Sequence, residues 1–274
     1  MGVTLDRDTT AELVQVAHAL ADAARIETLR HFRSDIAADD KGLSGLSGAR
    51  FDPVTVADRG SEHAMRAILA ARRPADGILG EEFGTTEGTS GLTWVLDPID
   101  GTRGYISGTP TWGVLISVAD SGGPLYGIID QPYIRERFEG GFGLARVIGP
   151  SGEAPLRVRQ GRGLGEAVLL STFPEIGTAA EHAAFRRVAG AVKLVRYGMD
   201  CYGYALLAAG QVDLVIEAGL QPYDVQAPIA VIQAAGGVVT DWQGRPAHQG
   251  GQILAAATPD LHAAALALLG QADG

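Results

Sequence analysis

The sequence contains little cysteine and little lysine. Cys201 is the only cysteine among 274 residues, so no disulfide can form within the chain, and we expect a reducing, cytoplasmic compartment. Lys41 and Lys193 are the only lysines, and 22 Lys and Arg stand against 32 Asp and Glu, which gives a formal net charge of -10. Because no basic stripe is available to neutralise a phosphate backbone, we do not expect nucleic acid as a partner.

Long hydrophobic runs are also missing. No apolar stretch reaches the roughly 18 residues that a membrane span requires, and Asp6, Arg7 and Asp8 occupy the place where a signal peptide would have its apolar centre. We therefore expect neither a membrane partner nor export. Hydrophobic residues still make up 46% of the chain, which is enough to bury the core of one large domain or of two closely packed halves.

The most informative part of the sequence is the end of an apolar strand, where Asp97 and Asp100 stand three residues apart directly before a glycine turn. Carboxylates are hard oxygen ligands suited to Mg2+, and the Gly101 and Thr102 amides at a helix start can receive a phosphate. Ile99 is apolar, so it can contribute only its backbone carbonyl. The alternative interpretation is an Asp-Pro turn that caps a helix.

Three further acidic segments accompany this strand end. Asp58 follows Thr55 at the start of a predicted helix, Glu81 and Glu82 follow a short apolar strand, and Asp224 precedes an apolar helix. In their order and approximate spacing, the four segments resemble the signature of the inositol monophosphatase superfamily over nearly the whole chain. Several stretches are more similar to its histidinol-phosphatase branch, namely 101–113, 127–132 with Glu136 and Arg137, and 200–204 through 217–224.

The resemblance implies a fold and a metal site. The fold is a layered α-β-α-β-α sandwich with an antiparallel N-terminal sheet and a mixed C-terminal sheet. The site holds two or three Mg2+ ions, of which Glu81, Asp97 and the Ile99 carbonyl bind a first, while Asp97, Asp100 and Asp224 bind a second. The acidic net charge points the same way, because an acidic protein repels an anionic substrate unless cations reverse the local potential.

The resemblance also implies the remaining roles. Asp58 and Thr102 are hydrogen-bonded in the family pattern and, together with metal, activate the water that attacks the phosphorus, while the Gly101 and Thr102 amides hold the phosphoryl oxygens. Relatives carry a lysine near the site, for which Lys41 is the candidate, and they are commonly homodimers. Asp58 has a second interpretation, because at the third position of a helix capped by Thr55 it also satisfies backbone amides.

Other hydrolytic chemistries fit the sequence poorly. An aspartyl-phosphate enzyme of the haloacid dehalogenase type has two aspartates separated by one residue, whereas two residues separate Asp97 and Asp100. A cysteine phosphatase has arginine six positions after its nucleophile, where Leu207 follows Cys201. The six histidines show no ligand spacing, so we predict no zinc site.

Two halves are predicted, with a boundary near residue 150, so that 1–150 carry most metal ligands and 151–274 carry Asp224 and the specificity residues. A capping box at 9–12 predicts a first helix that runs to about residue 31, and Thr55 begins a second. A polar loop is expected over 34–50. Strands are predicted at 77–80, 92–97, 113–119, 124–130 and 134–139. In the second half, strands at 167–171, 193–195, 212–217, 237–240 and 252–256 alternate with helices at 178–190, 200–210, 223–235 and 259–269.

The substrate is expected to be a small phosphorylated molecule, and histidinol phosphate is the first hypothesis. Its protonated amine and its imidazole call for carboxylates in the pocket beyond the metal ligands, and Asp200 and Glu217 are the candidates. Asp200 could instead cap the helix at 200–210. The alternatives are an inositol-phosphate, sugar-phosphate or nucleotide phosphatase with the same metals, and a non-catalytic metal-binding interaction protein that keeps the acidic cleft.

Overall fold

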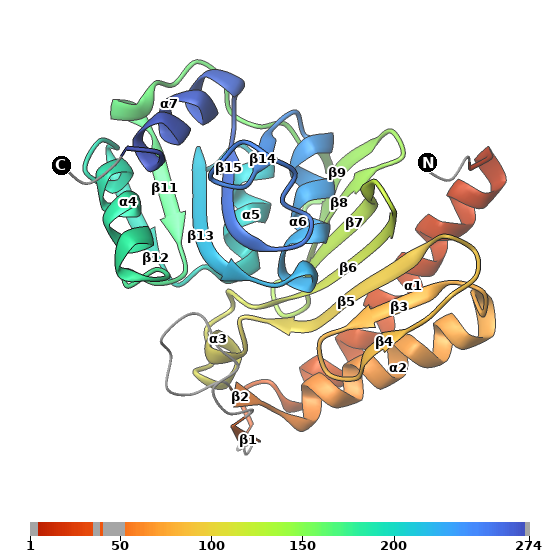
Figure 1. Ribbon diagram of the computed structural model, residues 1–274. Coiled ribbons are helices and arrows are strands. Elements are labelled where there is room, and N and C mark those ends of the chain that lie inside the picture. The colour runs from red at the N-terminus through yellow and green to blue at the C-terminus, as the bar shows by residue number, and fades with distance from the viewer. Residues whose placement is uncertain (1–4, 35–38, 41–52, 272–274) are drawn as a thin grey trace.

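An eight-stranded sheet forms the centre of the N-terminal half in the computed structural model (Figure 1). The structure describes residues 5–34, 39–40 and 53–271. The strand order is β10-β9-β8-β7-β6-β5-β3-β4, and all neighbours are antiparallel except β3 and β5, which are parallel. The strands are β3 (Gly77–Gly80), β4 (Gly84–Thr86), β5 (Thr93–Asp100), β6 (Gly113–Asp120), β7 (Gly123–Gln131), β8 (Glu136–Gly141), β9 (Leu144–Gly149) and β10 (Gly152–Pro155).

Helices α1 (Arg7–His31) and α2 (Val56–Arg72) cover one face of this sheet (Figure 1). The predicted apolar stripe of α1 is fully buried, since Leu13, Val16, Ala17 and Leu20 have no exposed surface. The predicted capping box at 9–12 is wrong: the helix begins earlier, and the Asp6 carboxylate accepts a hydrogen bond from the Thr9 amide at 2.7 Å. α2 begins as predicted, with Thr55 as its N-cap.

The second half contains a five-stranded mixed sheet with the order β12-β11-β13-β15-β14. β12, β11 and β13 are parallel, and β15 is antiparallel to both of its neighbours. The strands are β11 (Val168–Ser171), β12 (Leu194–Tyr197), β13 (Leu214–Leu220), β14 (Val238–Thr240) and β15 (Gly251–Ala256). Its helices are η1 (Leu164–Glu166), α4 (Ala179–Ala189), α5 (Asp200–Ala208), α6 (Pro222–Ala234) and α7 (Pro259–Leu269).

Helices α5 and α6 lie between the two sheets, and α4 and α7 pack together on the outer face of the second sheet (Figure 1). With α1 and α2 on the far side, the layers follow the predicted α-β-α-β-α order. α6 approaches the first sheet so closely that a Cβ added at Gly127 would lie 2.7 Å from the Ala227 Cα, and one at Gly140 would lie 2.5 Å from the Val231 Cα. One apolar core joins residues of both sheets around these helices.

Several details differ from the sequence predictions. β4, β9 and β10 were not predicted, and the first sheet is not purely antiparallel, because β3 runs parallel to β5. The short strands β1 (Asp39–Asp40) and β2 (Pro53–Val54) pair within and beside the predicted 34–50 loop. Lys41 and most of that loop lie outside the described residues, and the boundary near residue 150 stays a prediction. Among the helices of the described residues, none is long and apolar enough to cross a membrane.

Candidate active site

A bulge in β5 brings two aspartates to the same side of the first sheet. Side chains alternate along a regular strand, so residues three apart would face opposite sides. Asp97 pairs with Leu115 of β6 and Asp100 pairs with Gly113, so three steps along β5 match two steps along β6. The extra residue shifts the alternation between the two acids, and Pro98, which has no amide hydrogen, occupies this irregular segment. Both carboxylates can therefore face one site.

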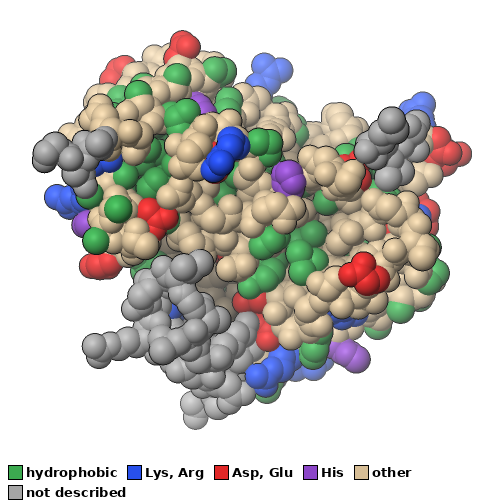
Figure 2. Space-filling view, viewed as in Figure 1, with side chains coloured by type: hydrophobic (Ala, Val, Ile, Leu, Met, Phe, Trp, Pro, Cys, Tyr) green, Lys and Arg blue, Asp and Glu red, His purple; other side chains and the backbone are tan. Residues whose placement is uncertain are grey.

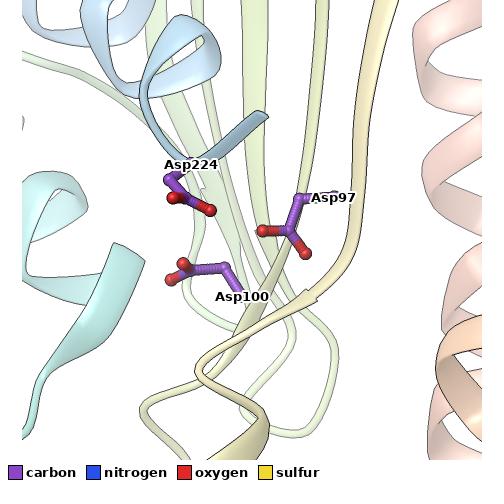
Figure 3. A group of neighbouring side chains, drawn as sticks. All are labelled: Asp97, Asp100 and Asp224. Carbon is purple, nitrogen blue, oxygen red and sulfur yellow. The ribbon is translucent and has the colours of Figure 1, made fainter. Parts of the chain in front are cut away.

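The third acid of the site comes from the start of α6. Asp224 stands at the third helical position, where its carboxylate accepts a hydrogen bond from the Gln221 amide at 2.7 Å. The Asp97, Asp100 and Asp224 side chains point toward a common space (Figure 3), and one ligand oxygen from each lies within 4.8 Å of the others. The predicted convergence of these three acids is therefore present.

The electrostatics of this cluster suit a cation. Burial, followed by the charges of Glu81, Asp100 and Asp224, raises the pKa of Asp97 well above its ordinary value. Burial and the charge of Asp224 raise the pKa of Asp100 to about 7, against hydrogen bonds from Cys201 that lower it. Carboxylates that disfavour one another's ionisation are stabilised by a divalent ion, and an all-oxygen donor set fits Mg2+. The residues present thus fit the metal that the sequence predicted.

A cleft surrounds the acidic cluster and unites elements from both halves of the chain. Of the ten predicted site residues, all except Asp58 line it. The lining consists of Glu81, Asp97, Ile99, Asp100, Gly101, Thr102, Arg103, Thr172, Phe173, Asp200, Glu217, Ala218, Gly219, Leu220 and Asp224. Glu82 was the alternative to Glu81 as a site residue. Among the described residues, the lining includes Glu81 and not Glu82, which agrees with the choice of Glu81 for the site.

The turn after β5 is built around Gly101. This residue has a φ of +84° at the N-cap of α3 (Thr102–Ile106), a left-handed conformation that favours glycine. A Cβ at this position would lie 2.9 Å from the Cβ and Cγ of Asp200. The Thr102 hydroxyl donates to the Ile99 carbonyl at 3.1 Å, and that oxygen retains a second lone pair. A phosphate-binding role for Gly101 and Thr102 stays a prediction.

Asp58 acts as the predicted helix cap. Its buried carboxylate accepts hydrogen bonds from the Thr55 amide at 2.8 Å and from the Thr55 hydroxyl at 2.6 Å. The pairing of Asp58 with Thr102 that the family pattern implies stays a prediction.

Asp200 and Glu217 add two acids to the cleft beyond the metal cluster. Burial and the charge of Asp100 raise the pKa of Asp200 to about 7, although Arg103 and Thr111 lower it. Burial raises the pKa of Glu217 to about 8, although its hydrogen bonds with Thr172 lower it. Asp200 does not cap α5 as the alternative interpretation proposed, because Met199 is the N-cap and makes no side-chain capping bond.

Sequence reasoning did not assign six of the lining residues to the site, and three of these, Arg103, Thr172 and Phe173, carry polar or aromatic side chains. Arg103 directly follows the predicted phosphate turn, and its guanidinium lies 4.9 Å from the ring centroid of Phe173. Thr172 and Phe173 follow β11, at the carboxyl end of a strand that is parallel to β13. Because ligands of open α/β sheets bind at the carboxyl ends of parallel strands, that position was the available signal.

Comparison with known proteins agrees with this geometry. The model of the inositol monophosphatase family matches residues 9–273. The chain belongs to this family. A solved member, an inositol monophosphatase from Zymomonas mobilis, has a TM-score of 0.83 and 36% identity, and the match covers 95% of this chain and 98% of that one.

Other relatives are named for different activities. The chain is 42% identical to the bifunctional phosphatase IMPL2, a chloroplastic protein of Arabidopsis thaliana, over 84% of this chain and 64% of that protein. The chain therefore spans less than two thirds of this relative's length. It is 31% identical to the histidinol-phosphatase of Chlorobaculum parvum, over 95% of this chain and 97% of that protein.

Family membership and the acidic cluster together identify a metal-dependent phosphomonoesterase.

Proposed function

We propose that this phosphomonoesterase hydrolyses L-histidinol phosphate to L-histidinol and phosphate, a step of histidine synthesis. The observation that carries the proposal is the presence of Asp200 and Glu217 in the same cleft as the metal acids. An ester whose alcohol carries positive charge gains from carboxylates beside its phosphate site, whereas a neutral polyol needs only hydrogen-bond partners.

Glu217 is held in place for such a role. Its Oε1 accepts hydrogen bonds from the Thr172 amide at 2.6 Å and from the Thr172 hydroxyl at 2.9 Å. Its Oε2 accepts a weaker one from the Ser171 hydroxyl at 3.4 Å. A carboxylate has about four acceptor sites, so these bonds orient Glu217 and leave capacity for a substrate ammonium or imidazolium.

The reaction replaces the ester P–O bond by a bond from phosphorus to a water oxygen, and the departing alcohol oxygen takes up a proton. Mg2+ bound by Glu81, Asp97, Asp100, Asp224 and the Ile99 carbonyl would supply Lewis acidity and lower the pKa of water. Asp58 and Thr102 would orient the attacking water, and the Gly101 and Thr102 amides would hold phosphoryl oxygens. Asp200 and Glu217 would hold the amine and imidazole end of the substrate.

Two further expectations belong to the proposal. A single cysteine supports a cytoplasmic enzyme, and the family resemblance supports a homodimer. The second candidate function is hydrolysis of inositol 1-phosphate or a related sugar phosphate, which the similarity to the Zymomonas mobilis enzyme supports. A non-catalytic interaction protein is disfavoured, because the full predicted set of metal acids is retained.

A phosphate-release panel with Mg2+ tests the proposal. Histidinol phosphate, inositol 1-phosphate, fructose 1,6-bisphosphate and 3'-phosphoadenosine 5'-phosphate are compared by kcat/KM on the wild-type protein. We expect histidinol phosphate to be the preferred substrate. A preference for any of the others would overturn the histidinol assignment and leave the phosphomonoesterase class intact.

A further inference from the structure

The outer wall of the cleft contains an aromatic ring that already receives a planar cation. Phe173 lies in the cleft lining and is 38% exposed, although most large apolar side chains of this protein are buried. The guanidinium carbon of Arg103 is 4.9 Å from its ring centroid. This distance is typical of a cation–π contact, in which the negative face of the ring attracts a positive group.

The position of this ring is fixed by one of the two specificity acids. Glu217 accepts both the amide and the hydroxyl hydrogen of Thr172, the residue directly before Phe173. The Gly198 amide donates to the Ser171 and Thr172 carbonyls at 3.2 and 3.1 Å, which holds the same turn from the other side. The ring and the Glu217 carboxylate are therefore positioned as one unit.

The wall combines two features that recognise the same chemical group. Asp200 and Glu217 attract positive charge, and Phe173 offers a flat face for a planar cation. The Arg103 side chain covers that face in this structure, and its positive charge also lowers the pKa of Asp200. A guanidinium and an imidazolium are both planar and delocalised, so the contact of Arg103 shows what kind of ligand group the ring can hold.

We propose that Phe173 is a specificity-determining residue that selects phosphomonoesters whose alcohol carries a planar cationic ring. The substrate ring takes the place of the Arg103 guanidinium on the face of Phe173. This inference rests on the proposed function and deepens it. Arg103 is long and flexible enough to leave the ring when a ligand enters. Phe173 thus acts on binding of the alcohol part, and it does not act on the phosphorus chemistry.

Binding of the product alcohol tests the inference directly. Histidinol and myo-inositol are titrated by calorimetry into Mg2+-loaded wild-type protein and into variants. Phe173→Leu keeps an apolar side chain and removes the π face, so we expect about tenfold weaker histidinol binding, and roughly unchanged binding for Phe173→Tyr. Arg103→Met removes the guanidinium from the Phe173 ring and removes a competing positive charge, so histidinol binding should become tighter.

A matched control is available outside the cleft. Tyr133 is 43% exposed and lies under Arg33, whose guanidinium carbon is 4.4 Å from its ring centroid. Tyr133→Leu removes a comparable cation–π contact without touching the cleft lining, so histidinol binding should be unchanged. Circular dichroism and the thermal midpoint confirm that each variant is folded.

The outcomes separate this inference from the proposed function. No histidinol binding to the wild type, an equal loss of histidinol and myo-inositol binding in Phe173→Leu, or a loss in Arg103→Met as large as in Phe173→Leu would each overturn the inference. If the panel instead favours inositol 1-phosphate while histidinol binding depends on Phe173, the substrate assignment fails and the ring's role stands. In steady-state assays on histidinol phosphate, Phe173→Leu should raise KM and leave kcat nearly unchanged.

Discussion

Asp97 and Asp100 face the same site because the pairing of β5 with β6 slips by one residue between them. The second sheet repeats this device between Glu217 and Leu220, where three steps along β13 match two along β15. One bulge therefore directs Asp97 and Asp100 toward the acidic cluster, and the other lies directly after Glu217, which we propose as a specificity residue. In both sheets, an irregular strand end rather than a regular strand shapes the cleft.

The acidic cluster should oppose folding when no metal is bound. We expect Asp97→Asn to stabilise the metal-free protein by roughly 1–2 kcal/mol, because it removes one of several close negative charges from a buried site. The same change should abolish the rise in thermal midpoint that Mg2+ produces and lower kcat about a thousandfold. Scanning calorimetry with EDTA and with Mg2+ measures the two stability effects, and a phosphate-release assay measures kcat. Glu87→Gln, an exposed acid elsewhere, is the control. A metal-free Asp97→Asn protein that is less stable than wild type would contradict the repulsion argument.

Gly101 should tolerate no side chain. In Gly101→Ala the new Cβ combines a left-handed φ with a 2.9 Å approach to Asp200, whereas Gly143→Ala has a similar φ of +81° and nothing within 4 Å. We expect about 1 kcal/mol of destabilisation for Gly143→Ala and clearly more for Gly101→Ala, with loss of activity only in the latter. Urea unfolding and phosphate release provide the two measurements. Equal destabilisation would show that the contact with Asp200 is easily relieved.

Asp200 occupies a strained backbone position. Its φ is +45°, in the left-handed region, so Asp200→Gly should be more stable than Asp200→Ala by about 1 kcal/mol. Both variants should use histidinol phosphate less well than an ester of a neutral alcohol, relative to wild type. The comparison of unfolding free energies isolates the backbone, and the ratio of kcat/KM values isolates the carboxylate. Equal losses on both substrates would remove Asp200 from substrate recognition.

Glu139 should make the fold sensitive to acid. Burial raises the pKa of Glu139, but hydrogen bonds from His18, Tyr126 and Arg146 have a larger effect in the opposite direction. The net result is a pKa lowered to about 2. Its stabilisation is therefore complete above the ordinary glutamate pKa and is lost as the pH falls toward 2. Glu139→Gln should cost about 3 kcal/mol at pH 7, and the difference from wild type should shrink between pH 4.5 and pH 2. Urea titrations across this range test it, with the exposed partner of Arg146, Glu153→Gln, as control. A difference that stays constant with pH would assign the loss to packing alone.

Much of the fold was predictable because its signals are local. Apolar periodicity located every long helix, although the cap predicted at 9–12 and the alternative cap at Asp200 were wrong, and the apolar runs located most strands. β9 and β10 were missed because their residues are half-exposed or exposed and carry charges, so they lack the alternation of a half-buried strand. The parallel pairing of β3 with β5 depends on a long connection through β4, and no local pattern encodes it.

The site was predicted by resemblance, and its geometry could not be read from spacing alone. A regular strand would have placed Asp97 and Asp100 on opposite faces, so only the bulge makes the pair a ligand set. Phe173 was missed because an exposed aromatic after a strand carries no motif. The role proposed for it depends on Arg103, which is 70 positions away in the sequence and touches it only in the folded chain.

Helix α6 links the acidic cluster to the first sheet, since it carries Asp224 in its first turn and packs through Ala227 and Val231 against glycines of that sheet. A fragment that stopped before α6 would retain the bulged strand and yet lose both Asp224, a predicted metal ligand, and the cover of the first sheet. Transplanting this catalytic apparatus onto another scaffold would therefore require the helix sandwiched between the sheets as well as the loops that border the substrate.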